Sequence, residues 1–339
     1  MTGTLPQPYL LFLGDERDPA HAKTAFGLRD WAPSRCIGEY ALPESTVTTG
    51  LPRFTPQEAY RRGARSMVIG VAPMGGALRP TWIPALNAAL EAGLDLISGM
   101  HGRLADTVML NATARRLGRH LFDVRRPPSG IPTASGRRRS GLRLLTVGTD
   151  CALGKKYTAL SIARELRARG VDADFRATGQ TGILIAGGGI PIDAVVADFV
   201  AGAAELLSPN APPGHWDIVE GQGSLFHPAY AGVSLGLLHG TQPDVIVVCH
   251  DPTRLEVAGH PGFPLPPLEE VIAQNLALGR RTNAAIRCAG VSLNTSKMSA
   301  ADAQACLSSY ATELNLPCAD PIRGGLELSR LVDAVLGGL

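Results

Sequence analysis

Short apolar runs alternate with helix-length segments along most of the chain. Runs bounded by glycine or polar residues predict buried strands, which we place at residues 9–15, 66–72, 94–98, 142–147, 173–176, 218–220, 244–249 and 290–294. Apolar residues at helical spacing predict helices at residues 20–29, 82–92, 157–169, 192–204, 268–278, 301–314 and 326–336. Strands and helices that alternate with short loops form parallel sheets, so the predicted fold class is α/β.

A stretch rich in Pro, Gly, Ser and Arg interrupts this alternation at residues 126–141. Its composition, without an apolar period, is typical of a linker, and we interpret its arginines as a solvated segment rather than a nucleic-acid patch. The linker divides a Rossmann-like parallel-sheet domain at residues 1–125 from a P-loop-like α/β domain at residues 142–339. No G-x-G-x-x-G motif follows the first strand, so we expect a supporting or interface role for the N-terminal domain.

Composition and charge are those of a packed globular protein. Hydrophobic residues make up 45% of the 339 residues, charged residues 18%, and the net charge is +2, so we expect no nucleic-acid or membrane partner. No apolar run approaches the roughly 20 residues of a membrane span, and no signal peptide is evident. Six cysteines without CxxC spacing indicate reduced thiols and a cytoplasmic protein, and an open sheet edge leaves room for a homo-oligomer.

The strand at residues 142–147 leads into a glycine-bounded loop and then into a helix. This is the context of a P-loop, in which backbone N–H groups and the helix N-terminus bind phosphate. In nucleotide-binding P-loops a Ser or Thr hydroxyl after the lysine ligates Mg²⁺, but here that position is Lys156, and an ammonium cannot ligate a cation. We therefore expect a loop that binds phosphate groups without a metal ion, through Gly148, Thr149, Asp150, Gly154, Lys155 and Lys156.

Three further motifs follow predicted strands, at the sheet edge where ligands bind in open α/β folds. Arg176 suits bidentate capture of a carboxylate or phosphate, and Gln180 and Thr181 add polar groups beside flexible glycines; a glycine turn capped by threonines is the alternative. Glu220 opens an acid-Gly-x-Gly element and is a candidate general base. Asn294, at the end of another strand, can read a purine edge with its amide.

Two residues of these motifs keep alternative interpretations. His227 has an intrinsic pKa near neutrality and is the second candidate base, but a turn histidine bonded to the backbone is an equal alternative. Cys151 lies in the P-loop, where a helix N-terminus and lysines favour a thiolate, so an acyl-thioester nucleophile is one interpretation. Because the sequence shows no histidine paired with Cys151, we favour a packing role for it in the loop.

The motifs resemble known proteins at two levels. Residues 148–155, 220–223 and 290–294 resemble the dethiobiotin synthetase and cobyric acid synthase branch of P-loop proteins, although that branch has Thr or Ser in place of Lys156. A closer resemblance covers nearly the whole chain and rests on four longer motifs, at residues 148–158, 176–182, 220–228 and 292–296. These motifs are similar to those of a family long classed as a domain of unknown function, whose characterised members are D-glutamate N-acetyltransferases of the DgcN type.

The closer resemblance implies acetyl transfer from acetyl-CoA to the amino group of D-glutamate, a step of D-glutamate catabolism. Coenzyme A carries phosphates, and the transfer hydrolyses no phosphoanhydride, so a P-loop with two lysines and no magnesium hydroxyl suits it. The donor is acetyl-CoA, and no metal is expected. The substrate ammonium needs a base, Glu220 or His227, and the two carboxylates of D-glutamate need Arg176, Gln180 and Thr181.

Two other functions stay open at this point. An ATP-dependent ligase or kinase of the dethiobiotin synthetase type would require Mg²⁺-dependent nucleotide hydrolysis. A CoA- or nucleotide-sensing regulatory protein would bind its ligand without turnover.

Overall fold

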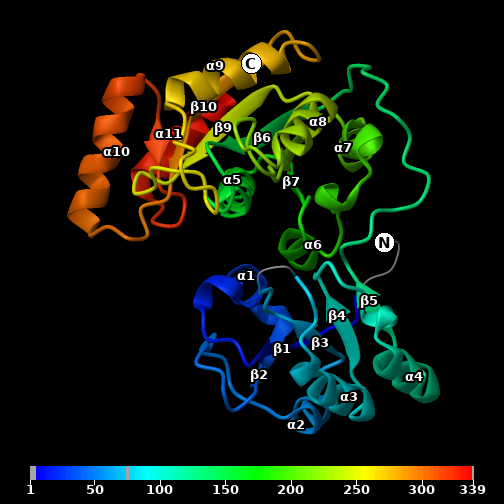
Figure 1. Ribbon diagram of the computed structural model, residues 1–339. Helices are drawn as coiled ribbons and strands as arrows, with labels where there is room; N and C mark the ends of the chain where they lie inside the picture. The colour runs from blue at the N-terminus through cyan, green and yellow to red at the C-terminus, as the bar shows by residue number, and fades with distance from the viewer. Residues whose placement is uncertain (1–4, 74–75, 338–339) are drawn as a thin grey trace. The chain divides into compact units, whose positions relative to one another are not determined.

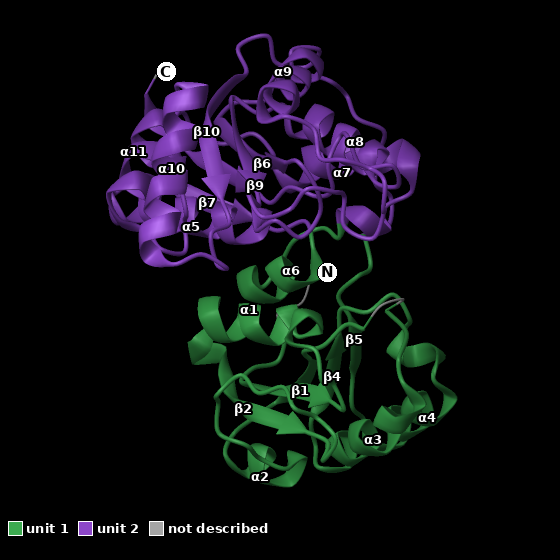
Figure 2. Cartoon of the chain, turned by 60° about the vertical axis from the view of Figure 1, so that its left-hand side comes forward, with its two compact units in different colours: residues 1–127, 179–191 green, residues 128–178, 192–339 purple. Residues whose placement is uncertain are grey.

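The computed structural model describes residues 5–73 and 76–337, which form two compact units (Figures 1 and 2). The first unit comprises Met1–Pro127 and Gly179–Pro191, and the second comprises Pro128–Thr178 and Ile192–Leu339. Each unit contains one sheet in which every pair of neighbouring strands is parallel. The predicted α/β class is therefore confirmed. Within the described residues no helix is both long and apolar enough to cross a bilayer.

The sheet of the first unit has the strand order β2-β1-β3-β4-β5. Its strands are β1 (Tyr9–Gly14), β2 (Cys36–Ala41), β3 (Ser66–Ile69), β4 (Asp95–Ser98) and β5 (Leu121–Asp123). Its helices from this part of the chain are α1 (Lys23–Trp31), α2 (Pro56–Arg61), α3 (Ile83–Glu91) and α4 (Val108–Leu117). The order reverses beside β1, which is the doubly wound arrangement of Rossmann-like sheets and confirms the predicted architecture.

The short helix α6 (Gln180–Ala186) also belongs to the first unit, although the chain enters it from the second. It packs against α1, where Thr181 Oγ1 lies 2.9 Å from Thr24 Oγ1. Arg35 Nη1 donates to the carbonyl oxygens of Leu184 and Ile185 at 3.3 and 3.0 Å, so a guanidinium satisfies carbonyls at the C-terminal end of α6. The sequence pattern did not predict this helix, because it is only seven residues long and Gly182 interrupts its apolar period.

The sheet of the second unit has the strand order β11-β10-β9-β6-β8-β7. Its strands are β6 (Leu142–Gly148), β7 (Ala173–Arg176), β8 (Trp216–Val219), β9 (Val245–His250), β10 (Arg287–Leu293) and β11 (Cys318–Ala319). Its helices are α5 (Lys155–Ala168), α7 (Val200–Leu207), α8 (Ala231–Thr241), α9 (Leu268–Gly279), α10 (Ala300–Leu314) and α11 (Gly325–Leu336). Because β6 is central and leads into the loop, the carboxyl ends of β8 and β9 lie on either side of that loop.

Helices cover both faces of this sheet (Figure 1). Leu144, Ile218 and Val245 pack with residues of α5 and α11 on one face. Val248 and Val291 pack with residues of α9 and α10 on the other. Strands buried on both faces are near-continuous apolar runs, which is why the central strands were predictable from sequence.

Arg139 binds the C-terminal ends of two helices of the second unit. Its Nη1 donates to the carbonyl oxygens of Glu205 (2.9 Å) and Ser208, at the end of α7. Its Nη2 donates to those of Gly240 (2.5 Å) and Thr241 (3.0 Å), at the end of α8. The guanidinium thus satisfies carbonyls that helix ends leave open and faces the negative ends of two helix dipoles. The interpretation of the arginines at 126–141 as solvated is therefore wrong for Arg139.

Replacement of Arg139 tests this clamp, by which we mean the hydrogen bonds from its guanidinium to the ends of α7 and α8. We expect Arg139→Met to lower the free energy of unfolding by about 2–3 kcal/mol, because carbonyl groups at two helix ends lose their donor. Urea denaturation measures the change. Arg137→Met is the matched control, since the Arg137 side chain is exposed, and it should change stability by less than about 0.5 kcal/mol. Equal stabilities of the two variants would contradict the clamp.

Candidate functional site

The loop between β6 and α5 presents the N-terminus of a helix. Helix α5 begins at Lys155, and its N-cap residue Gly154 has φ +109° and makes no side-chain cap hydrogen bond. No side chain therefore caps the N–H groups of the first turn, and the positive end of the helix dipole faces the loop. This is the local geometry that binds an anion, as the sequence predicts for residues 148–156.

The Lys155 side chain is buried between the loop and the end of β8. Its Nζ donates to the carbonyl oxygen of Asp150 at 2.6 Å. A Cβ added at Gly221 would lie 3.1 Å from Lys155 Cδ and 1.6 Å from the carbonyl oxygen of Thr146, so this close approach requires glycine. Burial lowers the pKa of Lys155, and the nearby thiols and the Asp150 carboxyl offset part of that effect. The glycine of the acid-Gly-x-Gly element thus makes room for the loop lysine.

Asp150 connects the loop to the segment after β9. Its carboxylate is fully buried, and Oδ2 accepts hydrogen bonds from Arg254 Nη1 at 2.6 Å and from the Ala258 N–H at 2.8 Å. Oδ1 accepts from the Cys151 N–H at 2.5 Å, and Arg254 Nη1 also donates to the Cys151 carbonyl oxygen at 2.7 Å. Asp150 therefore holds the loop in shape and brings the guanidinium of Arg254 to it, a contact that sequence reasoning missed.

His227 lies beside Asp150, with Nε2 3.8 Å from Asp150 Oδ1. Its Nδ1 accepts a hydrogen bond from the Ala229 N–H at 3.1 Å, which assigns the proton of the neutral ring to Nε2. Burial lowers the pKa of His227, and His260 and Lys155 act in the same direction against the Asp150 carboxylate. The ring is thus neutral near pH 7 and offers an Nε2–H donor, and it has both the backbone bond and the proximity to the loop that the sequence left as alternatives.

Glu220 connects the ends of β7 and β8. The residue is buried, and its Oε2 accepts a hydrogen bond from the Thr178 N–H at 3.0 Å. The Thr178 hydroxyl donates to the Glu220 carbonyl oxygen at 2.7 Å and accepts from Gln222 Nε2 at 2.9 Å. Two of the predicted motifs, at 176–182 and 220–228, therefore meet in one hydrogen-bonded group. The next residue, Gly221, lies against Lys155, so Glu220 is one residue away from the contact with the loop lysine.

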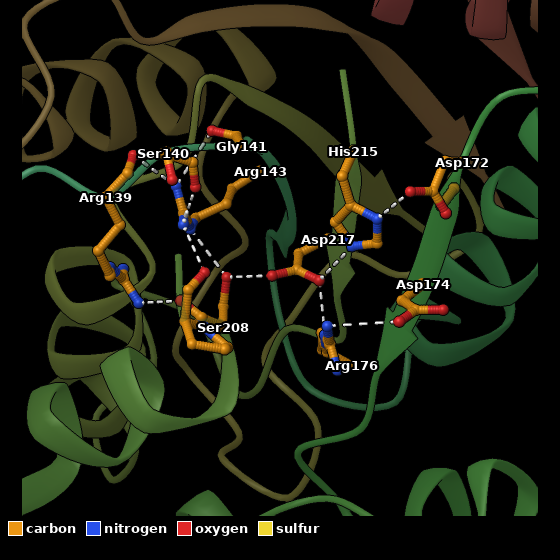
Figure 3. Close-up of polar contacts among 12 residues, drawn as sticks. Arg139, Ser140, Gly141, Arg143, Asp172, Asp174, Arg176, Ser208, His215 and Asp217 are labelled. Atoms are coloured by element: carbon orange, nitrogen blue, oxygen red, sulfur yellow. Dashed lines mark hydrogen bonds and ion pairs between the residues drawn. The ribbon is translucent and has the colours of Figure 1, made fainter. Parts of the chain in front are cut away.

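Arg176 is part of a charged network below these strand ends (Figure 3). Strand register places Asp174 opposite Asp217, and Arg176 lies between them, with Nε donating to Asp217 at 2.5 Å and Nη2 3.3 Å from Asp174. Asp217 is 1% exposed and also accepts from the Ser208 hydroxyl at 2.5 Å. Figure 3 shows the network continuing through Ser208 to Arg143. Arg176, predicted as a substrate contact, is thus held by two carboxylates of its own unit.

The remaining predicted residues lie in two places. Gln180 and Thr181 are in α6 of the first unit, where a Cβ at Gly99 would lie 2.7 Å from Gln180 Cβ. Asn294 and Thr149 meet at His250 in the second unit. The Asn294 N–H donates to the His250 carbonyl oxygen at 2.8 Å, and Thr149 Oγ1 lies 3.0 Å from His250 Nδ1. His250 therefore joins the ends of the loop and β10, which its position in the sequence did not reveal.

Among the described residues, two groups of His, Cys, Asp or Glu side chains have potential ligand atoms within 4.8 Å of one another. They are Asp150, Cys151 and His227, and Asp174, His215 and Asp217. In each group a carboxylate is already paired with an arginine, Asp150 with Arg254 and Asp217 with Arg176. The first group also gives Cys151 the histidine neighbour that the sequence did not show.

The His215 imidazole makes the stability of the second unit depend on pH. Burial disfavours its charged form, but bonds to Asp172 (2.8 Å) and Asp217 (3.2 Å) outweigh burial and raise the pKa of His215. A raised folded-state pKa stabilises the fold below the unfolded value of about 6.5, and this stabilisation is lost as pH rises through the folded value. We expect His215→Gln to abolish this loss in urea denaturation measured from about pH 6 upward. Parallel stability–pH curves for wild type and variant would contradict it.

Two family models match the chain. Residues 131–332 match the P-loop domain described as "Domain of unknown function (DUF1611_C)", and residues 37–127 match the Rossmann-like domain described as "Domain of unknown function (DUF1611_N)". The predicted architecture, Rossmann-like followed by P-loop-like, is confirmed by these matches.

Named relatives and a solved structure are similar to nearly the whole chain. A Tritonibacter scottomollicae protein named D-glutamate N-acetyltransferase is 48% identical over 328 residues, 97% of this chain and 98% of the relative. A Pseudoalteromonas sp protein of the same name is 44% identical over 320 residues, 94% of this chain and 96% of the relative. The crystal structure of a DUF1611 family protein from Anabaena variabilis ATCC 29413 matches with a TM-score of 0.88 at 31% identity, covering 97% of this chain and 99% of that one.

Proposed function

This chain belongs to the DUF1611 family, and on that premise we propose that it is an N-acetyltransferase that transfers the acetyl group of acetyl-CoA to the amino group of D-glutamate. The observation that carries the proposal is the identity of 48% and 44%, over almost the whole chain, to two relatives named D-glutamate N-acetyltransferase. Of the four motifs on which the family resemblance rested, those at residues 148–158, 220–228 and 292–296 lie in the second unit, and the motif at 176–182 begins there and continues into the segment 179–191 of the first.

The loop after β6 is the proposed binding site of the acetyl donor. Acetyl-CoA presents phosphates and a thioester carbonyl, and both are groups that N–H donors and cations bind. The uncapped start of α5 and the buried Lys155 supply such groups, and Lys156 adds a second ammonium. We assign donor binding to Gly148, Thr149, Asp150, Gly154, Lys155, Lys156 and Asn294. Asp150 acts by holding the loop and Arg254.

Glu220 is the proposed general base for the substrate ammonium. A base must remove a proton from that ammonium before the nitrogen can attack a carbonyl carbon. The Glu220 carboxylate is held by the Thr178 N–H and lies in the segment that contacts Lys155. His227 keeps Nδ1 in its bond to the Ala229 N–H, so it suits hydrogen-bond donation from Nε2 to a developing negative charge.

The D-glutamate carboxylates need cationic or polar partners. Arg176 is the proposed cation of the second unit, since 28% of its side chain is exposed while Asp217 and Asp174 hold its orientation. The assignment of Gln180 and Thr181 to substrate binding stays a prediction. Six cysteines outside any disulfide support a cytoplasmic location for the enzyme. We also propose that it is a homo-oligomer, which sedimentation velocity would measure.

Product formation tests the proposed function. Isotope-labelled acetyl-CoA and D-glutamate should give labelled N-acetyl-D-glutamate, with L-glutamate as the control substrate. Acetyl-CoA should also raise the melting temperature, because a ligand of the native state stabilises it. A rise with Mg·ATP alone, or CoA binding without acetylation of either enantiomer at any pH, would overturn the proposal.

Glu220→Gln tests the base. The amide keeps the size and can still accept from the Thr178 N–H, so the fold should be retained. We expect kcat at neutral pH to fall about 100-fold, and the deficit to shrink as pH rises and more substrate amine is neutral. Steady-state kinetics across pH measures both, and Glu313→Gln, on an exposed position of α10, is the control. An unchanged kcat at neutral pH would exclude Glu220 as the base.

A further inference from the structure

The thiol of Cys151 lies beside a histidine and a carboxylate of the second unit. It lies in the loop just ahead of the N-cap Gly154, is partly exposed and is not in a disulfide. Its Sγ, a ring nitrogen of His227 and a carboxylate oxygen of Asp150 lie within 4.8 Å of one another. Among the cysteines of the described residues, no other belongs to such a group.

The surroundings of Cys151 suit an anionic sulfur. Lys155 is close enough for the two charges to interact, and Arg254 donates to the Cys151 carbonyl oxygen at 2.7 Å. The positive end of the α5 dipole lies immediately after it. A helix N-terminus with lysine and arginine neighbours is the environment in which reactive cysteines of enzymes are found. Burial raises the pKa of the other five thiols, which keeps them protonated at neutral pH.

We propose that Cys151 is a catalytic nucleophile that carries the acetyl group from acetyl-CoA to D-glutamate as a thioester. The inference rests on the proposed function and specifies its mechanism. It also assigns the reacting thioester end of the donor to the loop, in place of the phosphates expected there from the sequence, because the pantetheine arm keeps the two groups too far apart for the same N–H groups. The N–H groups at the start of α5 then receive the oxyanion of each transition state.

The reaction then has two balanced steps. In the first, the Cys151 thiolate attacks the acetyl carbonyl carbon, a bond forms to Sγ, and the bond to the CoA sulfur breaks; the CoA thiolate leaves and takes a proton from water. In the second, the neutral amine of D-glutamate, deprotonated by Glu220, attacks the same carbon. The Sγ–carbon bond breaks, the thiolate of Cys151 is restored, and the nitrogen releases its second proton to water. No oxidant or metal enters either step.

His227 and Asp150 are positioning residues in this scheme. The Nε2–H of His227 faces the Asp150 carboxylate and lies in the group that includes Cys151 Sγ. Asp150 cannot rotate freely, since Arg254, Ala258 and the Cys151 N–H hold its two oxygens. The carboxylate therefore fixes the loop, and the Ala229 N–H holds the imidazole 3.8 Å from that carboxylate.

Trapping of the thioester tests the proposal on the wild-type protein. With radiolabelled acetyl-CoA and no D-glutamate, about one acetyl group per chain should become bound, be released by neutral hydroxylamine, and map to the peptide containing Cys151. Initial rates should give the parallel-line pattern of a ping-pong mechanism. Absence of bound label together with intersecting lines would overturn the proposal.

Substitution gives the second arm. Cys151→Ala should lower kcat by at least about 1,000-fold while the melting temperature and its rise with CoA are retained. Cys306→Ala, at another partly exposed cysteine, is the matched control and should keep wild-type kcat. A Cys151→Ala variant that acetylates D-glutamate near the wild-type rate would refute the nucleophile but leave the proposed function standing. Only failure of the wild-type protein to form N-acetyl-D-glutamate would refute that function.

Discussion

A buried ammonium at the start of α5 constrains the architecture of the second unit. Burying the charge of Lys155 is costly unless oxygen atoms surround it, and the carbonyl oxygen of Asp150 meets that need at 2.6 Å. The same position requires glycine at 221, where any side chain would collide with the Thr146 carbonyl oxygen. Asp150 must then be held in turn, which Arg254 does. The P-loop and the acid-Gly-x-Gly element therefore pack against each other through Lys155 and Gly221, although they are distant in the sequence.

The charged network around Asp217 compensates for a second buried charge, the Asp217 carboxylate. A carboxylate that is 1% exposed would be strongly destabilising alone, but Arg176, Ser208 and His215 all bond to it. Because these partners come from β7, the end of α7 and the start of β8, the network fixes the edge of the sheet. Arg176 therefore holds together the ends of β7 and β8, which carry Thr178 and Glu220, in addition to its proposed contact with the substrate.

The sequence predicted strands that are covered on both faces of a sheet better than strands at the edges of a sheet. All eight predicted strands are present, because strands such as β9 are covered on both faces and read as continuous apolar runs. The three strands that were missed, β2, β5 and β11, are all at sheet edges, where one side lacks a covering neighbour. Helix α8 was missed because its apolar residues do not keep to one face. The second half of the predicted helix at 192–204 is α7, but two short 3₁₀ turns replace its first half.

In the site, single motifs were predictable from the sequence. The pairing of Cys151 with His227 was not, because it depends on two loops that meet in space, which local sequence patterns do not encode.

Helix α6 gives the chain an unusual order of assembly. The first unit lacks one of its own helices until residues 179–191 have been made, since α6 packs on α1 through a contact between residues 157 positions apart. During synthesis from the N-terminus, β6, α5 and β7 of the second unit must leave the ribosome before the first unit can close. Contacts of such long sequence separation also slow folding, because the loop between them must be closed before they stabilise anything. The N-terminal half of this enzyme is therefore the first to be made but cannot be the first to be complete.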